Sequence, residues 1–221
     1  MATAAVADPL VVRSDGPSAG RYRPGTALPE NGRVTLAAND TLTLLNDGGT
    51  WTLRGPGTFP TGAPAARTSA APRVRAVSDR RVRVGAVRTV EGISLNRPNL
   101  WMIDVEQPGK VCVVDPTALT LWRAEADAAS TSTLTGPDGV SAEVAWAAGQ
   151  ASQDWPAAIP VVAGGAYRLS GVRPVAFTLE PLNATPASVP DAGRALIEHG
   201  CTTQLNLLVG QLENEDAGAD H

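Results

Sequence analysis

The chain has 221 residues, of which 43% are hydrophobic and 18% charged, and its formal net charge is −4. This composition indicates a globular protein and excludes a coiled coil, a collagen, a wholly disordered chain and a strongly basic nucleic-acid-binding protein. The 22 glycines and 18 prolines favour many turns and short strands over long helices.

The N-terminus suggests export. Residues 5–7, Ala-Val-Ala before Asp8, have the small-x-small pattern of a signal-peptidase site, but no basic region or full hydrophobic segment precedes them. We therefore expect a periplasmic or secreted bacterial protein whose signal peptide is incomplete in this chain; an ordinary Ala-rich terminus is the alternative. No stretch approaches the roughly 20 apolar residues that cross a bilayer, so no transmembrane segment is expected.

Residues 8–60 are expected to form a first β unit. In the segment 41–44, leucines alternate with threonines, so that Leu42 and Leu44 would share one face of a strand. Asn46-Asp47-Gly48-Gly49 predicts a hairpin turn, because these residues tolerate positive φ, and residues 50–54 would return as a strand. Short strands are also expected over 10–13 and 33–36.

Residues 25–59 resemble a FecR-like domain, the β-rich extracytoplasmic module of bacterial signalling. The resemblance follows a succession of glycine turns and short strands, namely Gly25…Leu28, Gly32-Arg33-Val34-Thr35-Leu36, Asp40-Thr41-Leu42-Thr43-Leu44-Leu45, Gly48-Gly49-Thr50 and Leu53…Gly55-Pro56-Gly57-Thr58-Phe59. In that family it implies a periplasmic module that relays a signal from an outer-membrane receptor to a sigma factor. The family's anti-sigma region and transmembrane helix are not found in this sequence, so only the domain type carries over.

Residues 61–98, called here the basic connector, are expected to be a loop with an edge strand. Over residues 61–100, eight arginines stand against Asp79 and Glu91. The predicted contact surface consists of Arg80, Arg81, Arg83 and Arg88. We expect it to bind an acidic partner, either another envelope protein or a second copy of this chain. The alternative is that these arginines dock on the acidic second unit of the same molecule.

Residues 99–182 are expected to form a second β unit. Seven or eight short strands separated by turns predict an antiparallel immunoglobulin-like β-sandwich. The following segment, 183–212, carries one apolar stripe at helical spacing, made of Ile197, Cys201, Leu205, Leu208 and Leu212. Asp191 is expected to cap this amphipathic helix and Gly200 to split it. Residues 213–221 are expected to be an acidic, disordered tail.

Cys112 and Cys201 are the two cysteines. No Cys-x-x-Cys or Cys/His spacing accompanies them, so a zinc site is not expected. An even count in an exported chain predicts one disulfide between them, with two buried thiols as the alternative.

No motif of catalysis or cofactor binding is evident. A Ser-His-Asp arrangement would have to use His199, and no Gly-x-Ser-x-Gly motif accompanies it. We therefore expect no enzymatic activity, cofactor or metal. The leading hypothesis is a non-enzymatic envelope protein acting as a sensory or protein-interaction accessory module, without binding to nucleic acid.

Two other functions stay open. Tryptophans of the second unit, Trp122, Trp146 and Trp155, would form a sugar-stacking platform if they lay exposed on one face, which makes a carbohydrate-binding module the alternative. The fifteen acidic residues of 101–221 leave a carboxylate-pair hydrolase as the third hypothesis.

Overall fold

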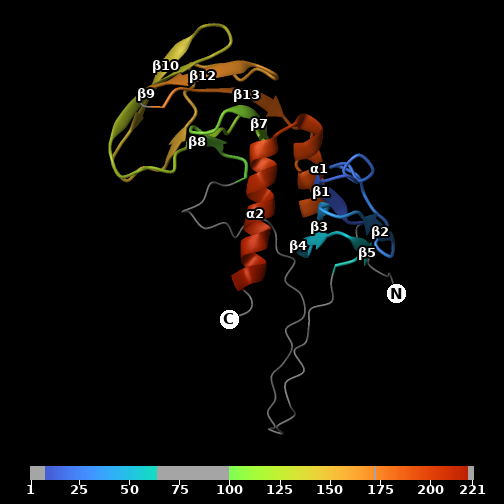
Figure 1. Ribbon diagram of the computed structural model, residues 1–221. Coiled ribbons are helices and arrows are strands. Elements are labelled where there is room, and N and C mark those ends of the chain that lie inside the picture. The colour runs from blue at the N-terminus through green and yellow to red at the C-terminus, as the bar shows by residue number, and fades with distance from the viewer. Residues whose placement is uncertain (1–7, 64–99, 172, 219–221) are drawn as a thin grey trace, which may run out of the picture.

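The computed structural model describes residues 8–63, 100–171 and 173–218 (Figure 1). The chain is mainly β, as expected from the sequence, with thirteen strands and two helices in these residues. The first unit contains the strands β1 (Leu10–Asp15), β2 (Arg33–Leu36), β3 (Thr41–Asn46), β4 (Gly49–Arg54) and β5 (Gly57–Pro60). They form a three-stranded sheet in the order β1-β3-β4 and a two-stranded sheet, β2-β5, with every pair antiparallel.

The central strand β3 is buried on both of its faces. Leu42 and Leu44 pack with Val11 of β1 in a cluster shared with β2. The neighbouring Leu45 points the other way and packs with Leu10 and the C-terminal helices. The sheet β1-β3-β4 is therefore an internal layer between the small sheet β2-β5 and the helices.

The second unit contains eight strands. They are β6 (Ile103–Asp104), β7 (Gly109–Val113), β8 (Thr120–Trp122), β9 (Ser130–Thr135), β10 (Ser141–Trp146), β11 (Ser152–Asp154), β12 (Ala166–Ser170) and β13 (Val175–Pro181). One sheet has the order β10-β9-β12-β13-β7 and the other the order β11-β8-β6. A common core takes side chains from both sheets, among them Leu121, Leu134, Tyr167 and Leu179.

The expectation of an antiparallel arrangement is wrong for two strand pairs. β13 runs parallel to β7, with Leu179 opposite Val111 and Pro181 opposite Val113, and β6 runs parallel to β8. Both β7 and β13 are connected to the helical pair. β13 is followed in the chain by the first helix, and β7 carries Cys112, whose disulfide partner Cys201 lies between the two helices. Side chains alternate in the same way along parallel and antiparallel strands, so the sequence pattern does not predict the direction of a strand.

The two helices are α1 (Val189–His199) and α2 (Thr202–Gly218). Gly200 separates them, as expected, in the left-handed conformation (φ 74°), and its N–H bonds to carbonyls of the last turn of α1. Two expectations are corrected. The N-cap is Ser188, whose hydroxyl accepts from Asp191 N at 3.2 Å, so Asp191 lies inside the first turn. Helix α2 continues to Gly218, past the expected start of the disordered tail at residue 213.

The helices pack against both β units. Their core cluster contains Leu10, Val12 and Leu45 from the first unit and Cys112 and Leu182 from the second. Figure 1 shows α1 and α2 side by side between the two groups of strands. Because the same helical residues are buried by both units, the described parts of the chain are joined by one continuous apolar cluster.

Candidate functional site

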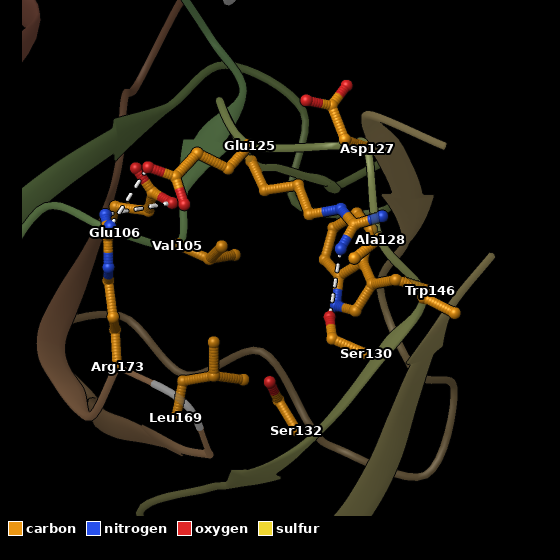
Figure 2. Close-up of a pocket in the computed structure, with 12 residues that line it drawn as sticks. Val105, Glu106, Glu125, Asp127, Ala128, Ser130, Ser132, Trp146, Leu169 and Arg173 are labelled. Atoms are coloured by element: carbon orange, nitrogen blue, oxygen red, sulfur yellow. Dashed lines mark hydrogen bonds and ion pairs between the residues drawn. The ribbon is translucent and has the colours of Figure 1, made fainter. Parts of the chain in front are cut away.

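A cavity of about 330 Å³ lies in the second unit, where the five-stranded sheet meets the loop that follows β8 (Figure 2). Its apolar side consists of Val105, Trp146 and Leu169, which belong to the core between the two sheets. Its polar lining consists of Glu106, Arg123, Glu125, Asp127, Ser130, Ser132 and Arg173. We call this cavity the Arg123 pocket.

Arg123 is the buried charge of the pocket and follows directly after β8. Only 6% of the surface of Arg123 is exposed to solvent. The guanidinium donates to the carbonyls of Gln150 (2.9 Å), Ala147 (2.8 Å) and Ala126 (3.3 Å) and to Ser130 Oγ (2.9 Å). These bonds compensate part of the cost of removing a cation from water and hold two loops together.

The Trp146 ring adds to this arrangement. The guanidinium carbon of Arg123 lies 5.1 Å from the ring centroid, within the range of a cation–π interaction. Trp146 is 3% exposed. Its ring is therefore covered by Arg123 on one side and belongs to the core.

The rim of the pocket is ordered by Arg173. Its guanidinium lies 3.0 Å from Glu125 Oε1 and 3.5 Å from Glu106 Oε1. Figure 2 marks these contacts with dashed lines. Asp104 fixes the backbone of Glu106, because Asp104 Oδ1 accepts a hydrogen bond from Glu106 N at 2.9 Å. Burial raises the pKa of the Asp104 carboxyl above its ordinary value. Exposed ion pairs contribute little to stability, so the Arg173 pairs mainly set the shape of the mouth.

Glu106 and Glu125 are the carboxylates that the structure brings together around one side chain. A glycoside hydrolase needs one carboxyl group free to protonate a leaving group and another free to act as base or nucleophile. Both carboxylates here are bound by Arg173. This pair therefore lacks the free carboxyl groups that such a hydrolase needs.

The three tryptophans expected to form a sugar platform do not share a surface. Trp146 is buried at the Arg123 pocket. Trp155 packs edge-on against Tyr167 and Phe177, at ring-centroid distances of 5.2 and 6.4 Å, and its Nε1 donates to Ile159 O. Trp122 lines neither the Arg123 pocket nor the surroundings of Trp155 and is half-buried on β8. These three tryptophans therefore do not form an exposed row of rings.

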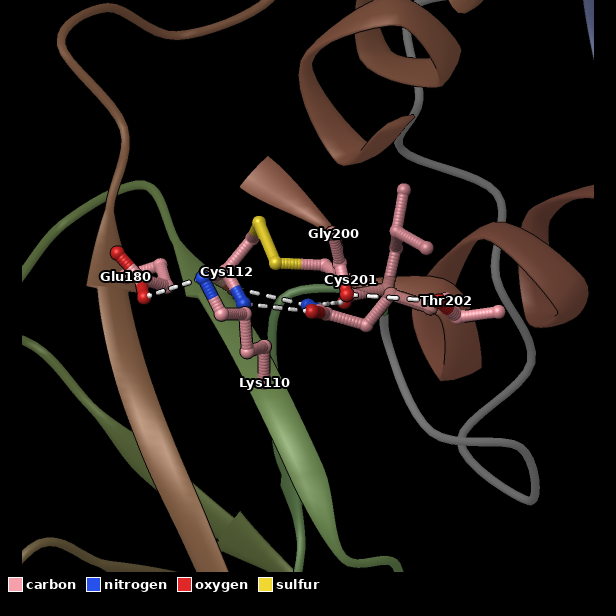
Figure 3. The surroundings of a disulfide bond; sticks show 8 residues. Lys110, Cys112, Glu180, Gly200, Cys201 and Thr202 are labelled. Atoms are coloured by element: carbon pink, nitrogen blue, oxygen red, sulfur yellow. Dashed lines mark hydrogen bonds and ion pairs between the residues drawn. A yellow bond between two sulfur atoms is a disulfide. The ribbon is translucent and has the colours of Figure 1, made fainter. Parts of the chain in front are cut away.

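The predicted disulfide between Cys112 and Cys201 is confirmed (Figure 3). Cys112 lies on β7 and Cys201 between α1 and α2, with Cα atoms 5.8 Å apart, and both residues are fully buried. The bond attaches the helical pair to the edge strand of the five-stranded sheet.

Gln204 is a buried residue that sequence reasoning missed. Its Oε1 accepts from Cys112 N at 2.6 Å, and its Nε2 donates to Cys112 O at 2.8 Å and Leu100 O at 2.7 Å. The side chain thus satisfies backbone groups on the edge of β7 that would otherwise be buried without partners. The available sequence signal was a glutamine directly beside the apolar stripe of a helix.

The other predicted site residues, Arg80, Arg81, Arg83 and Arg88, lie outside the described residues. Within the described ranges, no group of three or more His, Cys, Asp or Glu side chains could hold a metal ion. The helices of the same ranges include none that is long and apolar enough to cross a membrane. No protein-family model, curated protein or solved structure matches the chain.

Proposed function

We propose that this chain is a non-enzymatic, exported accessory module of the bacterial envelope that binds a partner protein through the basic connector. The observation that carries the proposal is the anchoring of the chain on both sides of this segment. Thr61 is 1% exposed, and its hydroxyl donates to the carbonyls of Pro29 and Glu30. Leu100 is 3% exposed, and its carbonyl accepts from Gln204. The described chain is thus held in place at Thr61 and again at Leu100, before and after the arginines.

Charge supports the same proposal. The described residues contain 19 acidic and 10 basic side chains, a formal net charge of −9, whereas residues 61–100 carry eight arginines and two acids. A basic segment of this kind attracts acidic protein surfaces, and charge at the rim of an interface mainly changes the association rate and the salt dependence. The partner is an acidic envelope protein or the acidic body of a second copy of this chain.

The compartment and the domain types belong to this proposal too. A buried disulfide supports a periplasmic or secreted location, since disulfides persist in oxidising compartments. The antiparallel hairpin of β3 and β4 around residues 46–49 supports the FecR-like assignment of the first unit. The core shared by the two sheets supports an immunoglobulin-like sandwich for the second unit, with its two parallel pairs as a departure.

Replacing three connector arginines tests the proposal. The variant Arg80→Ser, Arg81→Ser, Arg83→Ser is expected to keep the wild-type melting temperature while its complex with the partner, or its self-association, weakens and becomes less salt-dependent. Sedimentation velocity at two salt concentrations, on the purified chain alone and with periplasmic extract, measures this.

The matched control removes the same charge elsewhere. Arg33, Arg54 and Arg168 are exposed on strands of the body, so replacing these three by Ser should leave association unchanged. A lower melting temperature of the connector variant with unchanged association would instead show that the connector docks on its own molecule, and the proposal would be wrong.

A further inference from the structure

We propose that the Arg123 pocket binds a small aliphatic carboxylate, with the carboxylate group at its buried base and the hydrocarbon chain against its apolar wall. This inference does not rest on the basic connector, because all residues that line the pocket belong to the described part of the second unit. Three features of the pocket support it: the donors at its base, the direction of its acidic side chains and its apolar lining.

The base of the pocket offers hydrogen-bond donors that no described residue uses. A guanidinium has five N–H groups, and four of those of Arg123 donate to three carbonyls and Ser130 Oγ. The second hydrogen of Nη1 has no acceptor among the described residues. Ser130 accepts from Arg123, which leaves its own hydroxyl hydrogen without an acceptor in the described ranges, and the hydroxyl of Ser132 has no partner there.

Arg123 also lacks a counter-ion. None of the ion pairs formed by described residues includes it. A buried cation without an opposite charge is unfavourable, and carbonyl dipoles compensate it only in part. A bound carboxylate supplies the missing charge and accepts from Arg123, Ser130 and Ser132 together, since its two oxygens carry about four lone-pair sites. A neutral ligand accepts the same bonds but leaves the charge uncompensated.

The acidic side chains of the lining do not supply this counter-ion. Figure 2 shows the carboxylates of Glu106 and Glu125 turned toward Arg173, with which both form ion pairs. The carboxylate of Asp127 points away from the cavity in the same view. Glu125 and Asp127 are exposed, so water and salt screen their charges, whereas the buried Arg123 is screened much less. The base of the pocket therefore favours an anion over an amine.

The apolar wall selects an aliphatic anion over an inorganic one. Figure 2 shows the side chains of Val105 and Leu169 around the same opening as those of Ser130 and Ser132. The volume, about 330 Å³, lies at the lower end of the range of roughly 300–1,000 Å³ for ligand pockets. A hydrocarbon chain removes apolar surface from water on both sides of the contact, and each buried CH₂ group strengthens binding about fourfold. An anion such as phosphate gains nothing from this wall.

Calorimetric titration of the full, disulfide-bonded chain at pH 7 tests the proposal. The probes are acetate, butyrate and hexanoate, together with hexanamide, which has the chain of hexanoate but no charge. We expect saturable binding of hexanoate at one site and affinity that rises from acetate to hexanoate. Hexanamide should bind at least about tenfold more weakly than hexanoate, as the loss of a charged contact implies. Absence of saturable hexanoate binding, equal affinity for hexanamide, or equal affinity for all three acids would overturn the proposal.

Two variants of the half-buried Ser132 locate the site. Ser132→Ala removes one donor and should weaken hexanoate binding about tenfold. Ser132→Leu fills the cavity and should abolish the binding of hexanoate and hexanamide alike. The matched controls, Ser152→Ala and Ser152→Leu on β11, lie outside the pocket and should bind like the wild type.

Unchanged hexanoate affinity in both Ser132 variants would refute the assignment even if hexanoate binds elsewhere on the chain. Either result leaves the proposal for the basic connector standing, since that is tested by protein association.

Discussion

Gln204 and Cys112 are joined through both backbone polar groups of Cys112, which bond to the two ends of the Gln204 amide at 2.6 and 2.8 Å. Cys201, three residues before Gln204, is bonded covalently to the same Cys112. The start of α2 is thus attached to β7 by a disulfide and by an amide that takes the place of a neighbouring strand.

Replacing Gln204 by Leu should be strongly destabilising. Leucine has a similar size but leaves the N–H and C=O of Cys112 and the C=O of Leu100 buried without partners. Since each such group costs about 1–3 kcal/mol, we expect the free energy of unfolding in urea to fall by about 3 kcal/mol or more.

The control for this variant is Asn206→Leu on the same helix. Asn206 is exposed and makes a surface hydrogen bond with Arg13, so its loss should change stability by less than about 1 kcal/mol. Equal losses in the two variants would contradict the role given to Gln204.

Removing the disulfide should also lower stability. The bond closes a loop across 89 positions of the chain, for which the chain-entropy model gives about 4 to 5 kcal/mol. We expect Cys112→Ala, Cys201→Ala to unfold at clearly lower urea concentration, and reductant to shift the wild type in the same direction. Reductant should not affect the double variant; if it does, its effect on the wild type does not come from this bond.

Two helical glycines should respond to substitution with opposite signs. A Cβ on Gly193 would lie 2.8 Å from Leu45 Cδ2 and 3.2 Å from Leu10 Cδ2, both in the buried contact of α1 with β1 and β3. Gly193→Leu should therefore cost at least about 1–3 kcal/mol through overpacking. A Cβ on Gly210 in α2 would meet no described atom within 4 Å beyond its own helix backbone and chain neighbours, so Gly210→Ala should stabilise by roughly 0.5–1 kcal/mol through helix propensity. Thermal unfolding distinguishes them, and a stabilising Gly193→Leu would show that α1 does not pack this closely.

We expect acid to lower the stability of the first unit by protonating Asp40. Hydrogen bonds from the side chain and backbone of Ser18, and from Ala37 N, hold the pKa of the Asp40 carboxyl below its ordinary value of 3.8. Because the folded pKa lies below the unfolded one, this carboxylate stabilises the fold above about pH 4, and its contribution is lost as the pH falls through the folded pKa. Asp40→Asn should thus be less stable than the wild type at pH 7, with a smaller loss on acidification, as measured by urea unfolding across this range.

Asp104→Asn provides the control of opposite sign. Burial raises the folded pKa of Asp104, so its contribution to stability is present below 3.8 and is lost as the pH rises through the raised pKa. The stability of Asp104→Asn relative to the wild type should therefore improve with rising pH, whereas that of Asp40→Asn should improve with falling pH. Parallel curves for the two variants would contradict these assignments.

The sequence by itself determined the features that depend on near neighbours in the chain. Alternation of leucine and threonine predicted the strand β3, and the turn residues from Asn46 to Gly49 predicted its hairpin with β4. Gly200 predicted the break between the helices. The cysteine count predicted the disulfide because a chain with two cysteines allows a single intramolecular pairing.

Tertiary structure decided the features that depend on distant parts of the chain. The parallel pairing of β7 with β13, the burial of β3 on both faces and the Gln204 contact all join segments that no local pattern relates. The Arg123 pocket is the clearest case. An arginine after a short strand has the same local pattern as any surface arginine, and its burial results from carbonyls and a tryptophan more than twenty residues away in the chain. Charge and burial at such a site are set by which loops meet, and only the fold brings them together.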